Sequence, residues 1–333
     1  MVSDAFLQSY QAARHRCAFV SRTDRGWLVV SGKDRASYLQ GLLTNDTVAL
    51  RGGEGCYAAY LTPQGRMIAD LWVYELGDVI LLAMAIDVKA TVLAKLDQFI
   101  FSEDVKLGDA TDSFAGVVLL GPDAEAIASR VLADVAPGAL AALPEHGNLR
   151  ARFAGQPVIV LRVTDTGEPG FELLIDRSAG SALASALGAA GAAAVDAELA
   201  DVLRVEGGVP KFHRDMDEET IPLEAGIEPG AISMTKGCYV GQEVIVRVLH
   251  RGHGRVARRL VGLTLDGRAV PAPGTLAHAG GREVGRVTSA VASPALDRPI
   301  ALAYLHRDFT EPGTRVTIDG TEAVVTALPF VRS

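Results

Sequence analysis

Hydrophobic positions in the first half of the chain follow a helical spacing in some stretches and form short continuous runs in others. The runs at 56–62, 66–76 and 79–85 are separated by Pro-Gln-Gly and Gly-Asp, and they predict a three-stranded meander. A buried strand is expected at 26–32. The helices expected from the spacing cover 4–14, Tyr38 to Leu43 and Val88 to Phe99.

The chain continues with a strand, a Gly-Pro turn and a helix over 114–135, followed by a strand pair over 156–176. Two more helices are expected near 178–190 and 196–206. Strands that alternate with helices in short units favour an α+β fold with helices on one face of a sheet. After about residue 256, short strands separated by Gly, Pro and Asp-Gly are typical of a small antiparallel barrel or sandwich.

Length and charge narrow the class of protein. The 333 residues exceed one ordinary hydrophobic core and predict two or three domains, with an Ala- and Pro-rich boundary at 136–147. A composition of 49% hydrophobic against 22% charged residues is that of a globular protein. The net charge of -8 argues against general nucleic-acid binding, because a phosphate-binding surface needs a local basic excess.

The three cysteines show no pattern of a disulfide framework or a zinc site. The first residues lack the basic start and apolar core of a signal peptide, and no apolar run is long enough to span a membrane. We therefore expect free thiols, a cytoplasmic location and no membrane partner.

Asp70 is the first candidate for chemistry. It lies in an expected strand, where side chains alternate between faces, and it shares its face with Ile68, Trp72 and Tyr74. If that face is covered, a desolvated carboxylate there could bind a ligand or move a proton. A solvent-facing hairpin surface is the more ordinary alternative for a single strand.

Two glutamates flank the turn at 167–170. Glu172, between Phe171 and Leu173, could point into a cavity and accept hydrogen bonds from ligand N–H groups. Glu168 lies on the other side of the same turn. A lone glutamate at a strand start is more often on the surface, so the spacing leaves both alternatives open.

Cys238 follows Lys236 and Gly237 in a loop-like stretch. A neighbouring cation lowers the pKa of a thiol, so a reactive cysteine is one interpretation. A packed small hydrophobe is the other, and it is the commonest fate of a free cysteine.

The stretch from Arg247 to Arg259 holds five arginines, two histidines and no acid. It could contact a polyanionic tail, an RNA phosphate or an acidic partner, or it could pair with the acids that precede it. Those acids lie in the irregular segment 204–230, whose length favours either a functional loop or a linker.

Several motifs, in their order along the chain, resemble the folate-binding YgfZ family, which is related to the aminomethyltransferase (T-protein) of the glycine cleavage system. The motif Lys-Gly-Cys-Tyr-x-Gly-Gln-Glu at 236–243 marks the YgfZ branch, which includes the mitochondrial iron–sulfur assembly factor. The matching stretches are 38–46, 60–74, 167–172, 203–212, 217–226 and 236–244.

The resemblance implies an α+β fold of three domains, arranged as a cloverleaf around a central channel. Two domains are α/β, ferredoxin-like and folate-binding, and the third is a C-terminal antiparallel β-barrel. We expect the first α/β domain to combine 1–50 with 148–240, the second to cover 51–147 and the barrel to cover 245–333.

The same resemblance implies tetrahydrofolate or a derivative as cofactor, no metal, and Cys238 and Asp70 as catalytic residues. The residues expected to bind the folate are Asp70, Glu172, Tyr60, Arg204, Lys236 and Gln242. Two positions depart from T-proteins. These have two adjacent acids where this chain has Ala69 and Asp70, and an arginine before the aspartate equivalent to Asp201, where this chain has Ala200.

The function implied is that of a folate-binding accessory protein for the assembly or repair of iron–sulfur enzymes, including tRNA-modifying ones. Its expected partners are folate and iron–sulfur proteins or assembly factors, with RNA less favoured. The alternative is a tetrahydrofolate-dependent aminomethyl or one-carbon transferase of the T-protein type.

Overall fold

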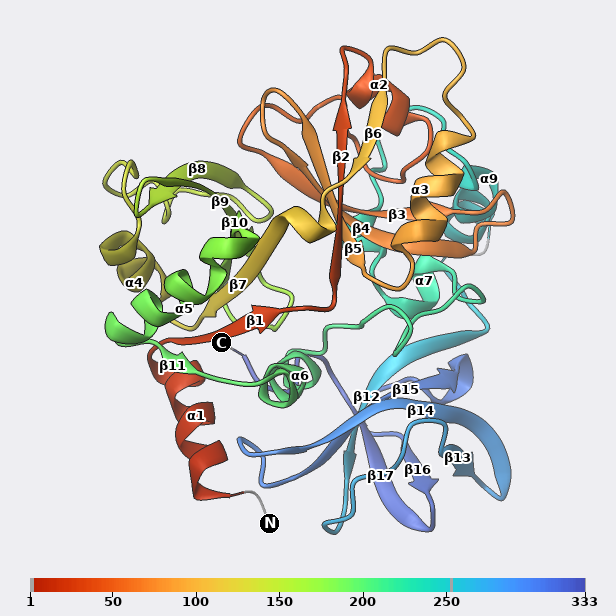
Figure 1. Cartoon of the computed structure of the whole chain (residues 1–333). Helices are drawn as coiled ribbons and strands as arrows, with labels where there is room; N and C mark the ends of the chain where they lie inside the picture. Colours follow the sequence, from red (N-terminus) through yellow and green to blue (C-terminus); the bar gives the residue numbers. More distant parts are fainter. Residues whose placement is uncertain (1–2, 252–253, 333) are drawn as a thin grey trace.

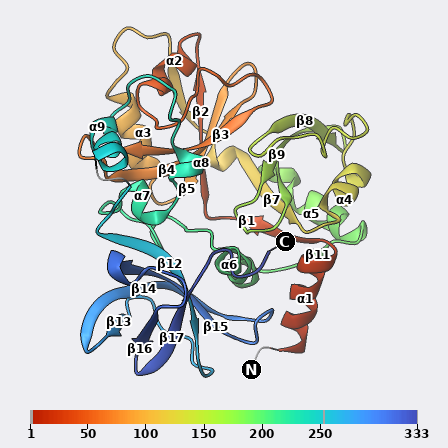
Figure 2. The ribbon, with the colours of Figure 1, turned by 180° about the vertical axis from the view of Figure 1, so that it is seen from behind.

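The chain folds into three lobes that surround one central helix (Figure 1). A computed structural model describes residues 3–251 and 254–332. Two lobes are α/β and the third is a closed barrel, which confirms the fold class expected from the sequence. Seen from behind, the helix α6 again lies where the lobes meet (Figure 2).

Sheet A forms the first α/β lobe and has six strands in the order β11-β1-β7-β10-β9-β8. All its strand pairs are antiparallel except β1 with β11. Its helices α4 (Ala124–Val131) and α5 (Gly180–Ala189) pack on one face. The strand bounds are β1 Ala18–Arg22, β7 Phe114–Leu120, β8 Asn148–Phe153, β9 Gln156–Val163, β10 Gly170–Asp176 and β11 Ala193–Ala194.

Sheet B forms the second α/β lobe, with five strands in the order β3-β4-β5-β2-β6. The expected meander is present as β3, β4 and β5. The strand bounds are β2 Arg25–Ser31, β3 Gly55–Leu61, β4 Met67–Glu75, β5 Ile80–Ala85 and β6 Lys106–Asp109. Helices α2 (Arg35–Gln40) and α3 (Lys89–Asp97) belong to this lobe (Figure 1).

The C-terminal lobe is a six-stranded closed barrel in the order β12-β15-β14-β13-β16-β17. Apolar residues from all six strands fill its interior. The strand bounds are β12 Arg258–Leu265, β13 Leu276–Ala279, β14 Arg282–Ser293, β15 Arg298–His306, β16 Arg315–Ile318 and β17 Thr321–Thr326. Closure leaves no unpaired edge strand in the sheet.

The remaining helices lie outside the two α/β lobes' own helix sets. Helix α6 (Ala197–Glu206) begins at Asp196, whose side chain accepts a hydrogen bond from the Leu199 amide and so satisfies one free N–H of the first turn. The others are α1 Asp4–His15, α7 Pro222–Ala225, α8 Glu228–Ala231 and α9 Gln242–Val246. Single turns lie at Thr111–Ser113, Arg177–Ala179, Arg247–Arg251 and Arg307–Phe309.

The sheets divide the chain differently from the domain boundaries proposed from the sequence. The chain first passes from one sheet to the other near its start. Strand β1 belongs to sheet A, and β2, which begins after only two intervening residues, belongs to sheet B. Sheet A therefore draws on 18–22 and 114–194, whereas sheet B is contained within 25–109. The segment from Phe212 to Val256 adds buried residues to the core of sheet B, not to sheet A.

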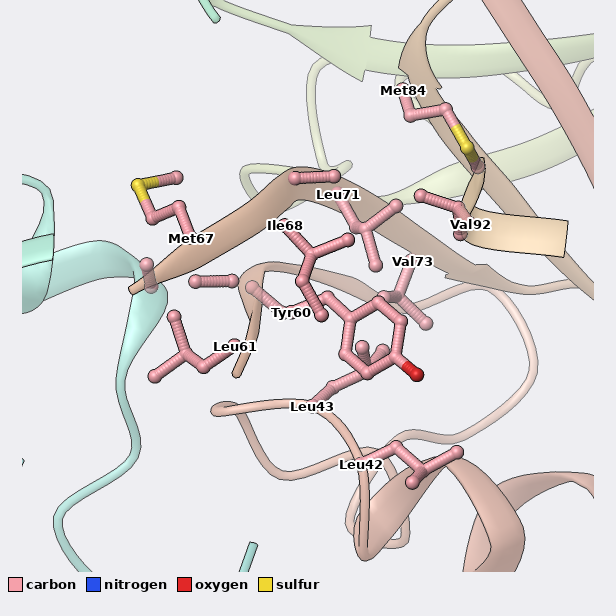
Figure 3. Close-up of a cluster of buried hydrophobic side chains, with 14 of the residues drawn as sticks. Leu42, Leu43, Tyr60, Leu61, Met67, Ile68, Leu71, Val73, Met84 and Val92 are labelled. Atoms are coloured by element: carbon pink, nitrogen blue, oxygen red, sulfur yellow. The ribbon is translucent and has the colours of Figure 1, made fainter. Parts of the chain in front are cut away.

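A bulge in β4 determines which of its side chains face the core. Leu61 pairs with Met67 while Tyr60 pairs with Ala69, so Ile68 has no partner on β3. Ile68 consequently joins the apolar cluster with Leu43 and Tyr60, on the face of sheet B opposite to Asp70 (Figure 3). The expectation that Ile68 shares the face of Asp70 is therefore wrong at this one position.

Candidate functional site

A cavity of about 230 Å³ opens where the two sheets face helix α6. Arg22 lines it from β1, Asp70 from β4 and Asp165 from the loop after β9. Helix α6 contributes Ala200 and Arg204. Segments far apart in the sequence thus provide one polar wall.

Asp70 is buried, with 2% of its surface exposed, so the solvent-facing alternative is wrong. Its Oδ2 accepts a hydrogen bond from the Tyr57 hydroxyl at 2.7 Å. Tyr57 pairs across the strands with Trp72, so all three side chains share the face of sheet B toward the cavity. Burial raises the pKa of the Asp70 carboxyl, although Tyr57 and Arg25 oppose the rise. This is the behaviour expected of a carboxyl that holds or transfers a proton.

Two arginines and one aspartate form an ion cluster at the cavity wall. Arg22 lies 2.8 Å from Asp165, and Arg25 binds the same carboxylate. The Arg25 guanidinium also stacks on Trp72, 3.9 Å from the ring centroid. Burial works against ionisation of Asp165, but Arg22 and Arg25 outweigh it and lower its pKa. One cavity therefore holds a carboxylate kept charged and another, Asp70, whose charge is disfavoured.

Glu172 lies behind this wall. It is fully buried on the face of sheet A that it shares with Leu174, and Arg22 approaches it to 3.6 Å. Neither Glu172 carboxyl oxygen has a hydrogen-bond partner among the described residues. Burial raises its pKa against the pull of Arg22 and Arg25. Glu172 is thus an acceptor without a donor, and Arg22, which lines the cavity, separates it from the cavity space.

Arg204 projects from the last turn of α6 into the cavity. Its guanidinium binds Asp201 at 2.6 Å and Asp215 at 2.7 Å, and also donates to Ser289 of the barrel at 2.8 Å. This one side chain therefore connects the cavity to the segment after α6 and to the barrel. With so many donors engaged, it is held in a fixed position.

Lys236 lies outside the cavity, on the other side of sheet B. Its Nζ donates to the carbonyl oxygens of Gln40, Leu43 and Asn45 at 2.7, 2.6 and 3.0 Å. Burial lowers its pKa to about 8. The ammonium fastens the loop after α8 to the end of α2, which is a structural role.

The structure does not bring Tyr60 to the cavity either. Tyr60 pairs with Ala69 across the strands, and both point away from Asp70 because side chains alternate. Tyr60 is 2% exposed in the apolar cluster of Figure 3, and burial raises its pKa to about 12. A ligand beside Asp70 would meet the opposite face of the sheet.

Cys238 lies between α8 and α9, and both Cys238 and Gln242 are outside the cavity lining. Cys238 is exposed, whereas Cys17 and Cys56 are buried. Gln242 is the first residue of α9 and is half-buried. Of the residues expected at the site, the structure brings together Asp70 and Arg204, with Glu172 directly behind.

The basic stretch from Arg247 to Arg259 is partly explained by pairing. Arg258 binds Glu224 at 3.2 Å, and Arg259 lies 3.6 Å from Glu228. These acids belong to the segment that precedes the stretch, as the ordinary interpretation expected. Residues 252–253 and the side chains of His250 and Arg251 lie outside the described residues.

Within residues 3–251 and 254–332, no helix is long and apolar enough to cross a membrane. The same part of the chain contains no group of three or more His, Cys, Asp or Glu placed to hold a metal ion.

Sequence reasoning missed the residues that surround Asp70. Arg22, Asp24 and Arg25 form a charged turn between two apolar strands, and Lys211 binds Asp24 across the cavity mouth. A cluster of three charges between two buried strands was the available signal. The missed Asp165 comes from the turn that also carries Glu168.

The chain is thus a three-lobed protein of two α/β lobes and a barrel, with a polar cavity between its two sheets and helix α6. The chain belongs to the glycine cleavage T-protein family. Residues 2–236 match the GCVT N-terminal domain, and residues 258–331 match the glycine cleavage T-protein C-terminal barrel domain.

Relatives over nearly the whole chain carry the name aminomethyltransferase. The protein from Rubrobacter xylanophilus is 34% identical over 97% of this chain and 85% of its own length. The protein from Nostoc sp. is 31% identical over 98% and 88%. The crystal structure of glycine cleavage system aminomethyltransferase T from Bartonella henselae covers 98% of this chain and 89% of its own, with a TM-score of 0.85 at 22% identity, and shows the same fold.

These comparisons correct the function expected from the sequence. The iron–sulfur accessory role is wrong as the main interpretation, because relatives of nearly equal length are aminomethyltransferases. Iron–sulfur partners and tRNA modification likewise receive no support. Tetrahydrofolate, the cofactor expected for this chain, is the cofactor of the aminomethyltransferase family.

Proposed function

We propose that this chain is a tetrahydrofolate-dependent aminomethyl or one-carbon transferase that uses the cavity between its sheets. The observation that carries the proposal is Asp70, a buried carboxyl with a raised pKa in a cavity that also holds paired cations. Family membership supplies the reaction class.

The residues present suit a folate. Glu172 lies directly behind Arg22 in the cavity wall and offers two buried oxygens without partners, which would accept from the ring N–H donors of a pterin once Arg22 moves aside. Lys211 lines the cavity and, although it pairs with Asp24, stays partly exposed and would attract a carboxylate of the tail, whereas Arg204 is already bound to Asp201 and Asp215. Bound tetrahydrofolate would supply the ring nitrogen that accepts the one-carbon unit.

Asp70 is the group best suited to proton transfer. Tyr57 donates to Oδ2 and holds the carboxyl in place, so the proton would be carried at Oδ1. The disfavoured charge makes the protonated form available nearer to neutral pH than for an exposed aspartate. Arg25, stacked on Trp72 and bound to Asp165, keeps a positive charge beside this carboxyl.

The two departures from T-proteins weigh differently. Ala69 points into the apolar cluster on the far face of sheet B, so its lack of a carboxyl removes no acid from the cavity face. Ala200 does line the cavity, and there a cation is absent. Folate recognition therefore relies more on Arg22, Arg25 and Lys211 than in enzymes with arginine at that position.

The test is turnover. Incubation with tetrahydrofolate and an aminomethylated lipoyl carrier should release ammonia, and Asp70→Asn should lower the rate by roughly 10²- to 10⁴-fold, the usual contribution of a general acid or base. Asp112→Asn, an exposed aspartate outside the cavity, is the matched control and should keep the rate. Absence of turnover under conditions where a T-protein works would overturn the proposal.

Membership of the YgfZ branch is a separate proposal that rests on the motif at 236–243. Cys238 is exposed in that motif, which supports access to a partner or reagent. If Cys238→Ala retains full turnover, the thiol has no part in the transfer reaction. A cytoplasmic location stays a prediction from the sequence.

A further inference from the structure

A second cavity, also of about 230 Å³, lies between the segment 213–220 and the outer wall of the barrel. Arg214 borders it from the segment, and Arg258 and Arg286 border it from the barrel strands β12 and β14. His213 adds a fourth basic group, whose pKa is raised by Asp87 and Glu218 although burial opposes the rise. None of these side chains belongs to the first cavity.

The basic groups are only partly neutralised by their own partners. Arg258 binds Glu224 at 3.2 Å, and Arg214 lies 3.6 Å from Asp201. Arg286 is exposed and forms no ion pair or side-chain hydrogen bond with any residue that the structure describes.

The acids of this cavity are already occupied. Asp215 binds Arg204 at 2.7 Å and accepts a hydrogen bond from Thr288 at 2.6 Å. Asp217 accepts from the Thr220 hydroxyl at 2.8 Å and from the Glu219 amide. Basic groups with unused donors therefore dominate the cavity.

A buried hydroxyl points to the same ligand chemistry. Tyr304 lines the cavity with 4% of its surface exposed, and its hydroxyl makes no hydrogen bond of ordinary geometry among the described residues, although Thr220 lies near enough to lower its pKa. Tyr304 is the direct cross-strand partner of Arg286, and the Arg258 guanidinium lies 4.7 Å from its ring centroid. A buried O–H donor without a partner costs free energy, and an acceptor would remove that cost.

We propose that this second cavity binds an anionic group, a carboxylate or phosphate, through Arg286, Arg214 and Tyr304. The pair Arg204–Asp215 forms the wall between the two cavities, because Arg204 lines the first and Asp215 the second. The anion could be a glutamyl carboxylate of a folate held in the first cavity, a source that rests on the proposed function. A free phosphate-bearing molecule is the other source, and it does not depend on that function.

Calorimetric titration of the full chain tests both sources. Inorganic phosphate probes the free anion, and triglutamyl against monoglutamyl tetrahydrofolate probes the tail. We expect Arg286→Ala to weaken phosphate binding about tenfold, or to abolish a preference for the longer tail. Tyr304→Phe keeps the ring and should weaken the same binding several-fold, and so serves if the arginine variant fails to fold.

Arg282→Ala is the matched control, since Arg282 lies exposed on the same strand outside the cavity. An equal loss in this control would show a general charge effect and overturn the site. So would the absence of both phosphate binding and a tail-length preference. Because the phosphate titration uses no folate, its outcome is distinct from failure of the transferase assay.

Discussion

At the scale of single residues, the two buried carboxyls Asp70 and Glu172 are destabilising in their charged forms and available for function. Both have raised pKa values because burial removes water from the carboxylate. A native fold does not gain stability from such groups. Their presence beside a cavity is explained by ligand binding or proton transfer.

The first stability prediction concerns Asp70→Asn. The folded pKa is raised, so the native state binds more protons than the unfolded chain above pH 3.8, and the stability contribution of Asp70 falls as pH rises through that window. The variant has no titrating carboxyl at this position and keeps an acceptor for Tyr57, so its stability does not fall in this way. In urea unfolding from pH 4 to 7, the free energy of unfolding of the variant relative to the wild type should therefore increase as pH rises. A variant whose stability relative to the wild type decreases with rising pH would contradict a raised pKa for Asp70.

The second prediction concerns Lys236→Met. Removing the ammonium leaves three carbonyl oxygens without their donor, and we expect a loss of about 3 kcal/mol at pH 7. The depressed pKa gives a further signature: between about 8 and 10.5 the native state binds fewer protons than the unfolded chain, so wild-type stability relative to the variant rises through that window. Denaturant curves at pH 7 and pH 10 check both signs.

Some site residues could be predicted from the sequence and others could not. Strand alternation assigned Asp70 to the face of Trp72 and Tyr74, but whether that face was covered depended on β1 and α6, which are distant in the chain. Lys236 illustrates the opposite case. Its neighbour Cys238 suggested a reactive pair, whereas three backbone carbonyls more than 190 residues away fix the ammonium.

At the scale of elements, the turn between β3 and β4 shows how tightly α9 is packed. Gly65 has φ of +76°, and a Cβ there would lie 2.9 Å from the Val244 side chain of α9. The turn itself was predicted from Pro-Gln-Gly at 63–65 of the sequence. The helix that covers it was not, because α9 has only five residues and no periodic apolar face.

Gly65→Ala should therefore destabilise the protein by roughly 1–3 kcal/mol, from the strained φ and the displaced α9 together. Gly237→Ala is the control, since its Cβ would meet nothing within 4 Å and its φ is ordinary. Thermal unfolding of both variants measures the difference. Equal melting temperatures of the two variants would show that α9 can move away from residue 65 at no cost in stability.

The local pattern of hydrophobic residues predicted the positions of strands better than it predicted which strands pair with one another. The strand expected at 26–32 is present as β2, while β1, β6 and β8 were not named, and assigning β1 and β2 to different sheets needs the register of β7 and β5. Amphipathic spacing reports which face of an element is buried. It does not report which sheet completes the burial.

At the scale of the whole molecule, His213 joins the segment after α6 to sheet B. Its ring nitrogens contact Asp87 at 2.6 Å and Glu218 at 3.1 Å, and the backbone of His213 has φ of 60°. Burial lowers its pKa, but the two carboxylates outweigh that effect and raise it. The contact is strongest when the ring is protonated.

We expect the stability that His213 contributes to be complete below its unfolded value near pH 6.5 and to be lost as pH rises through its higher folded pKa. His213→Asn should then be less stable than the wild type at pH 6 and equal to it at pH 9. Asp87→Asn should give the same profile and, combined with His213→Asn, add little. A difference that grows with pH would reverse the sign and exclude the contact.

The two residues between β1 and β2, Thr23 and Asp24, also have a mechanical meaning. The chain leaves one sheet at Arg22 and enters the other at Arg25, and all four residues line the first cavity. The chain passes between the two sheets a second time from β6 to β7, so this wall is one of two strand-to-strand connections between the α/β lobes. A molecule bound in this cavity would contact residues of both lobes, so its binding would also restrain the movement of one lobe against the other.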